Sequence, residues 1–479
     1  MGLVKALFDI RKGERGKTAG MFLWFFIIIA AYWFLKPLRS ALVLEQLGAD
    51  SIRQLKVLTA FVSAGVVAAY SIALTRFSRE RLTYLILGAF IWTLAFFWFF
   101  FTFFGVVKVV YYCFYIFLDL FITVNVALFW TFLADITSSD SAKRLYGLIG
   151  AGGVIGGFLG SFTCKQVLAA LRSEEGGEAH MILVVAIAYS AILVIVYLVS
   201  RNVRRTTGIV TGVIASPGKS KFHDALEGAR EVFASRYFIG ICCIMASYEF
   251  ISTVNDFTFH KAVELVYAES GGSQSVLGVV LAAVKGISGI DIAAWLDRVF
   301  GVSIGGVGPF VSKKAFYSSF FPEFFLAMNL VALVVQVLLT SFVIRAVGMT
   351  AALLVLPAAL VGISTGFFFF PVLMLAQTLY LFDNALNYSI NQTSREMLFV
   401  PVPRKAKYRA LAFIDMFVLR TAKASAGFLL LLLPLVMTTS SSADLKWYML
   451  FTVPLGLAWI VVTVYLGRRF HALSEKEEA

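Results

Sequence analysis

The sequence predicts an all-α membrane protein that crosses the bilayer twelve times and folds as two lobes of six helices. The chain has 479 residues, of which 60% are hydrophobic and only 14% charged, and its mean hydropathy is +0.86. A soluble domain of this composition would lack the charge that its surface needs. Apolar runs of about 20 residues, long enough to cross a bilayer, recur along the chain, and a polar linker divides them into two sets.

The apolar runs set the expected spans. The first six lie at residues 20–44, 55–75, 81–105, 107–134, 145–170 and 180–200. The second six lie at 236–260, 316–344, 350–370, 371–392, 409–436 and 447–467. The run from 350 to 392 is continuous, and Pro371 is its expected break because proline interrupts helical hydrogen bonding. No signal peptide is predicted, since residues 1–17 are polar and basic and the first apolar run is too long.

Lysine and arginine set the expected orientation. They gather in the N-terminal tail, in the loops after the second, fourth and tenth spans, in the central linker and at the C-terminal end. The alternate loops are acidic or nearly neutral. Because positively charged loops stay in the cytoplasm, twelve spans with both termini cytoplasmic satisfy every loop. The net charge of +13 therefore needs no nucleic-acid partner.

The expected domains are an N-terminal lobe at 1–200, a cytoplasmic linker at 201–235 and a C-terminal lobe at 236–479. The linker contains TGIVTGVIASPGKSK, which is rich in glycine, proline and serine. Two related halves are typical of transporters whose lobes rock around a central site. Residues 264–315 are too interrupted for a span and are predicted as an extracytoplasmic insertion. Within them, 276–300 fits either an amphipathic interfacial helix or a re-entrant segment.

Cations interrupt the first two spans. In AAYWFLKPLRSALVL, Lys36 and Arg39 are three residues apart and share one helical face. Lys56 opens the second span. A cation at the bilayer centre costs roughly 3 kcal/mol or more, so these side chains are expected to face a wet cavity or a partner. The alternative is an interfacial position from which they reach the lipid phosphates.

The seventh span, YEFISTVNDFTFHK, carries charges of both signs. Glu249 and Asp256 are seven residues apart and share a face, and Lys261 ends the segment. Asp119, in the fourth span, is expected to pair with a neighbouring helix rather than to bind a ligand.

The eleventh span, AFIDMFVLRTAKASAG, contains Asp415, Arg420 and Lys423. The apolar run 425–436 that follows argues against a solvated helix face. A structural ion pair between Asp415 and a cation is the alternative to a binding role.

The stretch FWTFLADITSSDSAKRLYGLIGAGGVIGGFLG, residues 129–160, joins the fourth and fifth spans. It carries Asp135, a Ser/Thr turn, Lys143 and Arg144, and then glycines that let another helix approach closely. The two cations are expected either in a cytoplasmic gate or in an ordinary basic loop.

Intramembrane cations outnumber carboxylates in this reading. A cavity with surplus positive charge selects an organic anion. The sequence has no GxxxxGK[ST] loop and no nucleophile–base pair, so it predicts a protein that is not an enzyme and uses no cofactor. Its four histidines are scattered and its four cysteines lie in apolar runs, so no metal site is expected.

These residues resemble those of the ATP/ADP translocase family, the nucleotide transporters of plastids and intracellular bacteria. FWTFLADITSSDSAKRLYGLIG is the closest match, followed by YWFLKPLRSALV and SREMLFVPVPRKAKYRALAFIDMFVLRTAKASAG. The resemblance covers most of the transmembrane region except 264–315. Ser40, Phe257 and Leu411 stand where the family carries charged residues, so a divergent member is predicted.

The resemblance implies a major-facilitator-like bundle that moves a nucleotide by exchange or proton-linked uptake, as a monomer in a bacterial inner membrane. The residues expected to bind substrate are Lys36, Arg39, Lys56, Asp256, Lys261, Asp415, Arg420 and Lys423. The residues expected in a cytoplasmic gate are Asp135, Lys143, Arg144, Tyr146, Arg395 and Glu396. Two alternatives stay open: transport of another amphipathic anion, such as a lipid or cell-envelope precursor, and a non-transporting membrane scaffold.

Overall fold

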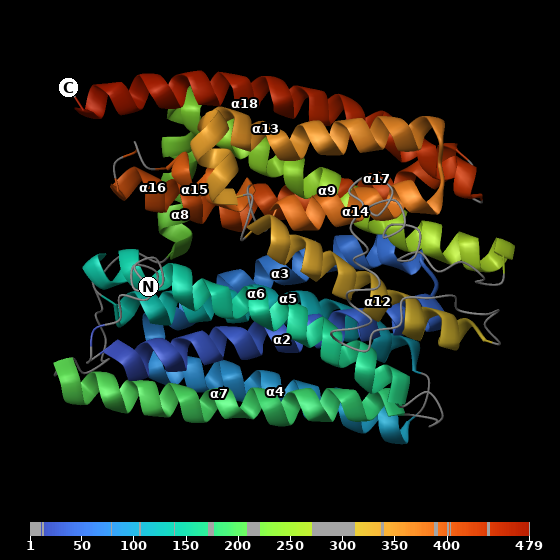
Figure 1. Cartoon of the computed structure of the whole chain (residues 1–479), viewed down its shortest axis with the longest axis horizontal. Coiled ribbons are helices and arrows are strands. Elements are labelled where there is room, and N and C mark those ends of the chain that lie inside the picture. Colours follow the sequence, from blue (N-terminus) through green and yellow to red (C-terminus); the bar gives the residue numbers. More distant parts are fainter. Residues whose placement is uncertain are drawn as a thin grey trace. The chain divides into compact units, whose positions relative to one another are not determined.

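The computed structural model describes Arg11 and residues 14–77, 79–104, 107–137, 139–170, 177–207, 221–270, 312–336, 340–387, 391–399, 402, 404–437 and 441–478. Within these ranges the regular elements are all helices (Figure 1). Eleven helices in the same ranges are long and apolar enough to cross a membrane. The protein is therefore a multi-pass membrane protein, as its composition predicts.

The chain divides into two compact units, Met1–Gln46 with Val66–Ser220 and Leu47–Gly65 with Lys221–Ala479. The first unit contains α2 (Arg15–Gln46), the end of α3 (Ser51–Arg76), α4 (Arg79–Phe103), α5 (Lys108–Asp135), α6 (Ser139–Ala170) and α7 (Gly177–Thr207). The second contains the start of α3, α8 (Lys221–Ala234), α9 (Arg236–Ser270), α12 (Lys313–Val334), α13 (Thr340–Phe369), α14 (Leu373–Leu386), α15 (Gln392–Met397), α16 (Arg404–Phe413), η5 (Ile414–Val418), α17 (Leu419–Val436), η6 (Ser442–Tyr448) and α18 (Met449–Glu478). The domain boundaries expected from the sequence stay a prediction.

The helices follow the predicted spans, but the eighth and the tenth differ. The eighth is expected at 316–344, whereas α12 ends at Val334 and Thr340 already begins α13. The break expected at Pro371 is confirmed, because α13 ends at Phe369 and α14 begins at Leu373. The span expected at 371–392 is shorter than predicted, since α14 has only 14 residues. After α14 the backbone takes π-helical geometry at Asn387. The apolar run is therefore longer than the regular helix that it forms.

Two segments of the expected domain plan lie partly outside the described residues. In the expected linker, α7 continues to Thr207 and α8 forms a helix, while 208–220 are not among the residues described. In the expected insertion, α9 continues to Ser270 and 271–311 are not described, so the amphipathic stretch 276–300 stays a prediction.

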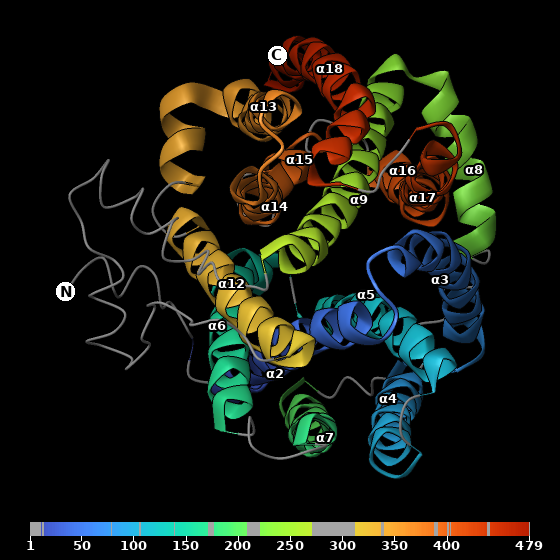
Figure 2. The same cartoon turned by 90° about the vertical axis from the view of Figure 1, so that its right-hand side faces the viewer.

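Helix α2 forms the core of the first unit. It packs against α5, α6 and α7, while α4 lies against α7 (Figures 1 and 2). Trp24 is fully buried, with its ring 5.5 Å from that of Phe129 and 5.1 Å from that of Phe132 on α5. Burying such large aromatic surfaces fixes α2 between its neighbours.

Glycines on α6 set its close approach to α2. Gly152, Gly156 and Gly160 recur every four residues and so share one face. A Cβ atom at Gly152 would lie 2.7 Å from the carbonyl oxygen of Phe22, and one at Gly156 would lie 2.5 Å from that of Phe26. The predicted role of this segment in close helix packing is confirmed.

In the second unit, α9 packs against α14, α17 and α18, and α13 lies beside α18 (Figures 1 and 2). The ring of Phe259 on α9 stacks on Phe324 of α12 at 4.6 Å and on Tyr380 of α14 at 4.5 Å. This aromatic cluster holds three helices together around the middle of α9.

We expect Gly156→Ala to destabilise the first unit, because the added methyl group meets backbone atoms of α2 that cannot move aside. Overpacking of this kind costs about 1–3 kcal/mol. A thermal melt of the purified protein in detergent measures the loss. Gly150→Ala, on the same helix, is the matched control, since its Cβ would meet no described atom within 4 Å. Equal melting temperatures for the two variants would contradict the packing argument.

Candidate functional site

Two cations lie on α2 inside the first unit. Lys36 is 5% exposed and Arg39 is 3% exposed. Arg39 donates from Nη1 to Oδ1 of Asp119 on α5 at 2.7 Å, and its guanidinium lies 4.2 Å from the centre of the Tyr115 ring. The predicted pairing of Asp119 with a neighbouring helix is therefore confirmed. Both cations point into the protein, which argues against the alternative in which they reach for lipid phosphates.

Aromatic rings surround Lys36. Its Nζ lies 4.4 Å from the centre of the Trp33 ring and 5.6 Å from that of Tyr32. Electron-rich ring faces stabilise a cation that has left water. With Tyr115 beside Arg39, this part of α2 and α5 offers positive charge and flat apolar faces within one unit.

The second unit has its own buried ion pair. Lys56, near the start of α3, lies with Nζ 2.5 Å from Oδ2 of Asp256 on α9. His260 lies one turn further along α9, with Nδ1 2.7 Å from the main-chain oxygen of Asp256. The structure thus brings two predicted site residues, Lys56 and Asp256, into direct contact.

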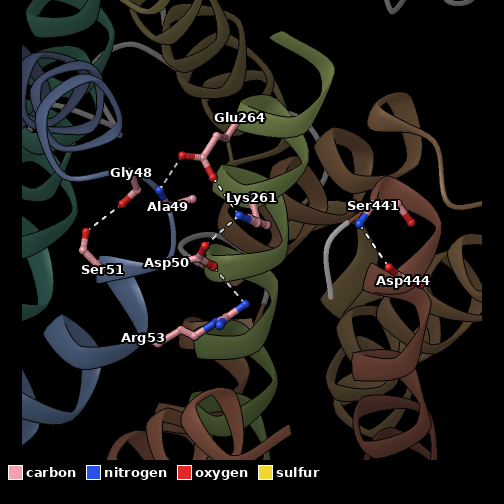
Figure 3. Close-up of polar contacts among 9 residues, drawn as sticks. All are labelled: Gly48, Ala49, Asp50, Ser51, Arg53, Lys261, Glu264, Ser441 and Asp444. Atoms are coloured by element: carbon pink, nitrogen blue, oxygen red, sulfur yellow. Dashed lines mark hydrogen bonds and ion pairs between the residues drawn. The ribbon is translucent and has the colours of Figure 1, made fainter. Parts of the chain in front are cut away.

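A second network ties the turn before α3 to the end of α9 (Figure 3). Lys261 donates to Asp50 at 3.0 Å and to Glu264 at 2.8 Å. Arg53 pairs with the other oxygen of Asp50 at 2.9 Å, and the amide of Ala49 donates to Glu264 at 3.0 Å. Asp50 therefore links a cation on α3 with one on α9. The nearby Ser441–Asp444 contact in Figure 3 is a local cap at the start of η6.

This turn requires glycine. Gly48 has φ +77°, which residues with a side chain rarely adopt, and a Cβ there would lie 3.0 Å from Oε1 of Glu264. Sequence reasoning missed both Asp50 and Glu264. The spacing of Glu264, three residues after Lys261 on the same helical face, was the available signal.

The three charged residues of the eleventh span lie in different surroundings. Asp415 lies in η5, a π-helical turn, and its side chain is exposed. Arg420 and Lys423 follow in α17 and are half-buried. π-helical turns inside α-helices occur frequently at functional sites.

The expected gate residues are only partly described. Asp135 ends α5, Lys143 and Arg144 lie in the first turns of α6, and Glu396 lies in α15, but the side chains of all four are outside the described part.

Two of the gate residues make aromatic contacts. The ring of Tyr146 lies 5.5 Å from that of Trp130, and the guanidinium of Arg395 lies 5.5 Å from the ring of Tyr248.

The turn between α5 and α6 is tied to the start of α2. Lys17 donates to the main-chain oxygen of Ile136 at 3.2 Å, and Ser141 donates to Glu14 at 2.7 Å. These contacts anchor the junction that carries Asp135, Lys143 and Arg144 to the central helix of its own unit.

The sequence profile of the TLC ATP/ADP transporter family matches residues 1–109, 102–297 and 372–470. The chain belongs to this family. The ADP,ATP carrier protein 2 of Chlamydia trachomatis serovar D is 25% identical over 370 residues, which span 73% of this chain and 63% of that protein, less than two thirds of its length. The ADP,ATP carrier protein 2 of Chlamydia pneumoniae is 23% identical over 97% of this chain and 91% of that protein.

Solved structures with a similar fold are also transporters. A point mutant of the nucleoside transporter NupG superposes with a TM-score of 0.56 at 11% identity, covering 94% of this chain and 99% of that one. A bacterial homologue of the iron transporter ferroportin gives 0.55 at 9% identity, covering 95% and 98%. A D-xylose-proton symporter gives 0.51 at 12% identity, covering 94% and 95%. The predicted major-facilitator-like fold is confirmed.

We expect the Lys56–Asp256 pair to behave as one energetic unit. Asp256→Asn removes the carboxylate that neutralises Lys56, and breaking a buried pair costs about 3–5 kcal/mol. The double variant Lys56→Met/Asp256→Asn leaves no buried charge from the pair, so its free energy of unfolding should fall much less. Thermal unfolding of the purified single and double variants measures the coupling.

The matched control for this cycle is the half-exposed pair of Arg409 and Glu231, 3.3 Å apart. Glu231→Gln should cost about 1 kcal/mol or less, because solvent screens that pair. Additive losses for Lys56 and Asp256 would show that they do not depend on each other.

Proposed function

We propose that this chain is a secondary transporter that carries a nucleotide across a bacterial inner membrane by alternating access. Membership of the TLC ATP/ADP transporter family, joined to buried cations in apolar helices, is the observation that carries the proposal. These cations are Lys36 and Arg39 in the first unit and Lys56 and Lys261 in the second. Each unit, taken by itself, thus buries positive charge among apolar helices.

Exchange of partners gives the proposed binding chemistry. Without substrate, Asp119 neutralises Arg39 and Asp256 neutralises Lys56. A phosphate group is also negatively charged, and its several oxygens accept from more donors than a carboxylate can. The substrate phosphates therefore compete with Asp119 and Asp256 for the cations. Before substrate binds, neither cation is left unpaired in the protein interior.

Recognition of the base has separate support. Trp33, Tyr32 and Tyr115 present ring faces next to Lys36 and Arg39. Stacking of a nucleobase on an aromatic ring contributes about 1–3 kcal/mol. We assign the phosphates to the cations and the base to these rings.

The remaining predicted residues keep their proposed roles. Asp415, Arg420 and Lys423 serve as further substrate contacts. Asp135, Lys143, Arg144, Tyr146, Arg395 and Glu396 form the cytoplasmic gate. The proposal also includes cytoplasmic termini and a monomeric protein with no catalytic activity of its own.

Transport of a different amphipathic anion is the second candidate. Identity to the Chlamydia carriers is only 23–25%. The resemblance implies that Ser40, Phe257 and Leu411 stand where the family carries charged residues. A different set of charged residues suits a substrate whose charge differs from that of ATP. A thermal-shift series with ATP, ADP, other nucleotides and soluble lipid headgroups separates the two candidates, because only the true substrate class raises the melting temperature.

We expect proteoliposomes loaded with ADP to take up labelled ATP, and Arg39→Gln to lower the initial rate at least tenfold. The physical reason is the loss of a cation, worth about 1.4 kcal/mol for each factor of ten. Lys108→Gln is the matched control, since Lys108 is exposed at the start of α5. Wild-type vesicles that ignore every nucleotide tested would refute the proposed substrate class.

A further inference from the structure

A buried carboxylate in the second unit has no place in the proposed anion site. Asp383 lies on α14 and is 0% exposed. Neither of its carboxylate oxygens has a hydrogen-bond partner among the described residues. An ionised carboxylate in such a place is very costly, so it is normally paired or neutralised.

Polar groups on α9 lie next to Asp383. The polar side chains of Ser252 and Asn255 lie close to its carboxylate and favour the charged form. The carboxylates of Asp256 and Glu249 repel its negative charge. Asn255 is 1% exposed, and neither of its amide atoms has a hydrogen-bond partner in the described part of the chain. Two packed helices therefore bring unsatisfied polar groups together in one buried place.

Cations from the packed elements are engaged elsewhere. Helix α14 packs against α9, α12 and α13. On α9, Lys261 binds Asp50 and Glu264, and the ring of His260 stacks on Phe321 at 5.4 Å with Nδ1 at Asp256. Lys56 is bound to Asp256. The charged residues of α12 are Lys313, Lys314 and Glu323, and the described side chains of α13 include no charged group. Within the described ranges, no ion pair involves Asp383.

We propose that Asp383 is a proton-binding site of the second unit. Its carboxylate takes a proton from a hydronium ion. One O–H bond of that ion breaks as one forms on the carboxylate, a water molecule is released, and the negative charge is removed. The new hydroxyl can donate to the amide oxygen of Asn255, which satisfies an atom of each residue. Two observations favour neutralisation of Asp383 by a proton. No cation is paired with it in the described ranges, and its two acidic neighbours make a negative charge there more costly.

The proton site has a physical link to the anion site. Asp256 follows Asn255 on α9 and is the partner of Lys56. A phosphate that binds Lys56 frees the Asp256 carboxylate, which adds negative charge near Asp383 and strengthens proton binding. Linkage then requires the proton to favour the phosphate in return. This step, which depends on the proposed function, makes proton and nucleotide move together.

Infrared difference spectroscopy of the purified full-length protein tests the proton site without any transport. Wild-type protein should show a protonated carboxyl band that disappears in Asp383→Asn, whose amide mimics the neutral acid and preserves folding. Asn384→Ala is the matched control, because Asn384 donates to the carbonyl of Tyr380 on its own helix. A band that survives in Asp383→Asn would overturn the assignment.

Proteoliposomes with an inward proton gradient test the coupling. Wild-type protein should accumulate labelled nucleotide, and Asp383→Asn should lose the gradient-driven part at least tenfold while it retains nucleotide exchange. Glu249→Gln should shift the pH midpoint of uptake to more acidic values, because one acidic neighbour is lost. Accumulation in Asp383→Asn equal to wild type, or driven by sodium instead of protons, would overturn proton coupling. If no nucleotide moves in wild type, the proposed function fails, and the infrared band alone decides whether Asp383 binds a proton.

Discussion

Neutralisation of buried charge is the constraint on which the rest of this structure depends. Lipid and packed side chains do not solvate ions, so an intramembrane charge needs a partner from the protein. Arg39 has Asp119, Lys56 has Asp256, and Lys261 has Asp50 and Glu264. The Lys261–Glu264 pair lies within α9, and each of the other pairs joins two helices or a turn and a helix. These buried charges therefore hold the helices of each unit together.

Close packing supports the same arrangement. The glycines of α6 bring its backbone against α2, and α2 carries Lys36 and Arg39 further along its length. A helix that is fixed on several sides positions its cations accurately, which matters because charge–charge energies change steeply with distance in a dry interior. The packing that fixes α2 therefore also fixes the positions of its two cations.

Sequence reasoning recovered the spans because apolar length is a strong signal in membrane proteins. It also recovered the break at Pro371, the close contact of the glycine segment and the pairing of Asp119, since each follows from local chemistry. It missed Asp50 and Glu264, whose local partners Arg53 and Lys261 lie three residues away. The contacts that join them into one network, Lys261 with Asp50 and Ala49 with Glu264, connect residues more than 200 positions apart, and only folding brings these together. The sequence did not single out Asp383, because its burial depends on how α14 packs among α9, α12 and α13.

Asp256 and Asp383 illustrate two solutions to one problem on adjacent helices. Asp256 lies beside Lys56 and can stay ionised, since the pair carries no net charge. Asp383 is more deeply buried and has no such cation within the described ranges, so loss of its charge is the cheaper outcome. The two sites then respond differently to an arriving anion. In the proposed mechanism, the ion pair exchanges its carboxylate for a phosphate, whereas the neutral acid only gains or loses a proton. Because the two carboxylates are neighbours, either event changes the energy of the other.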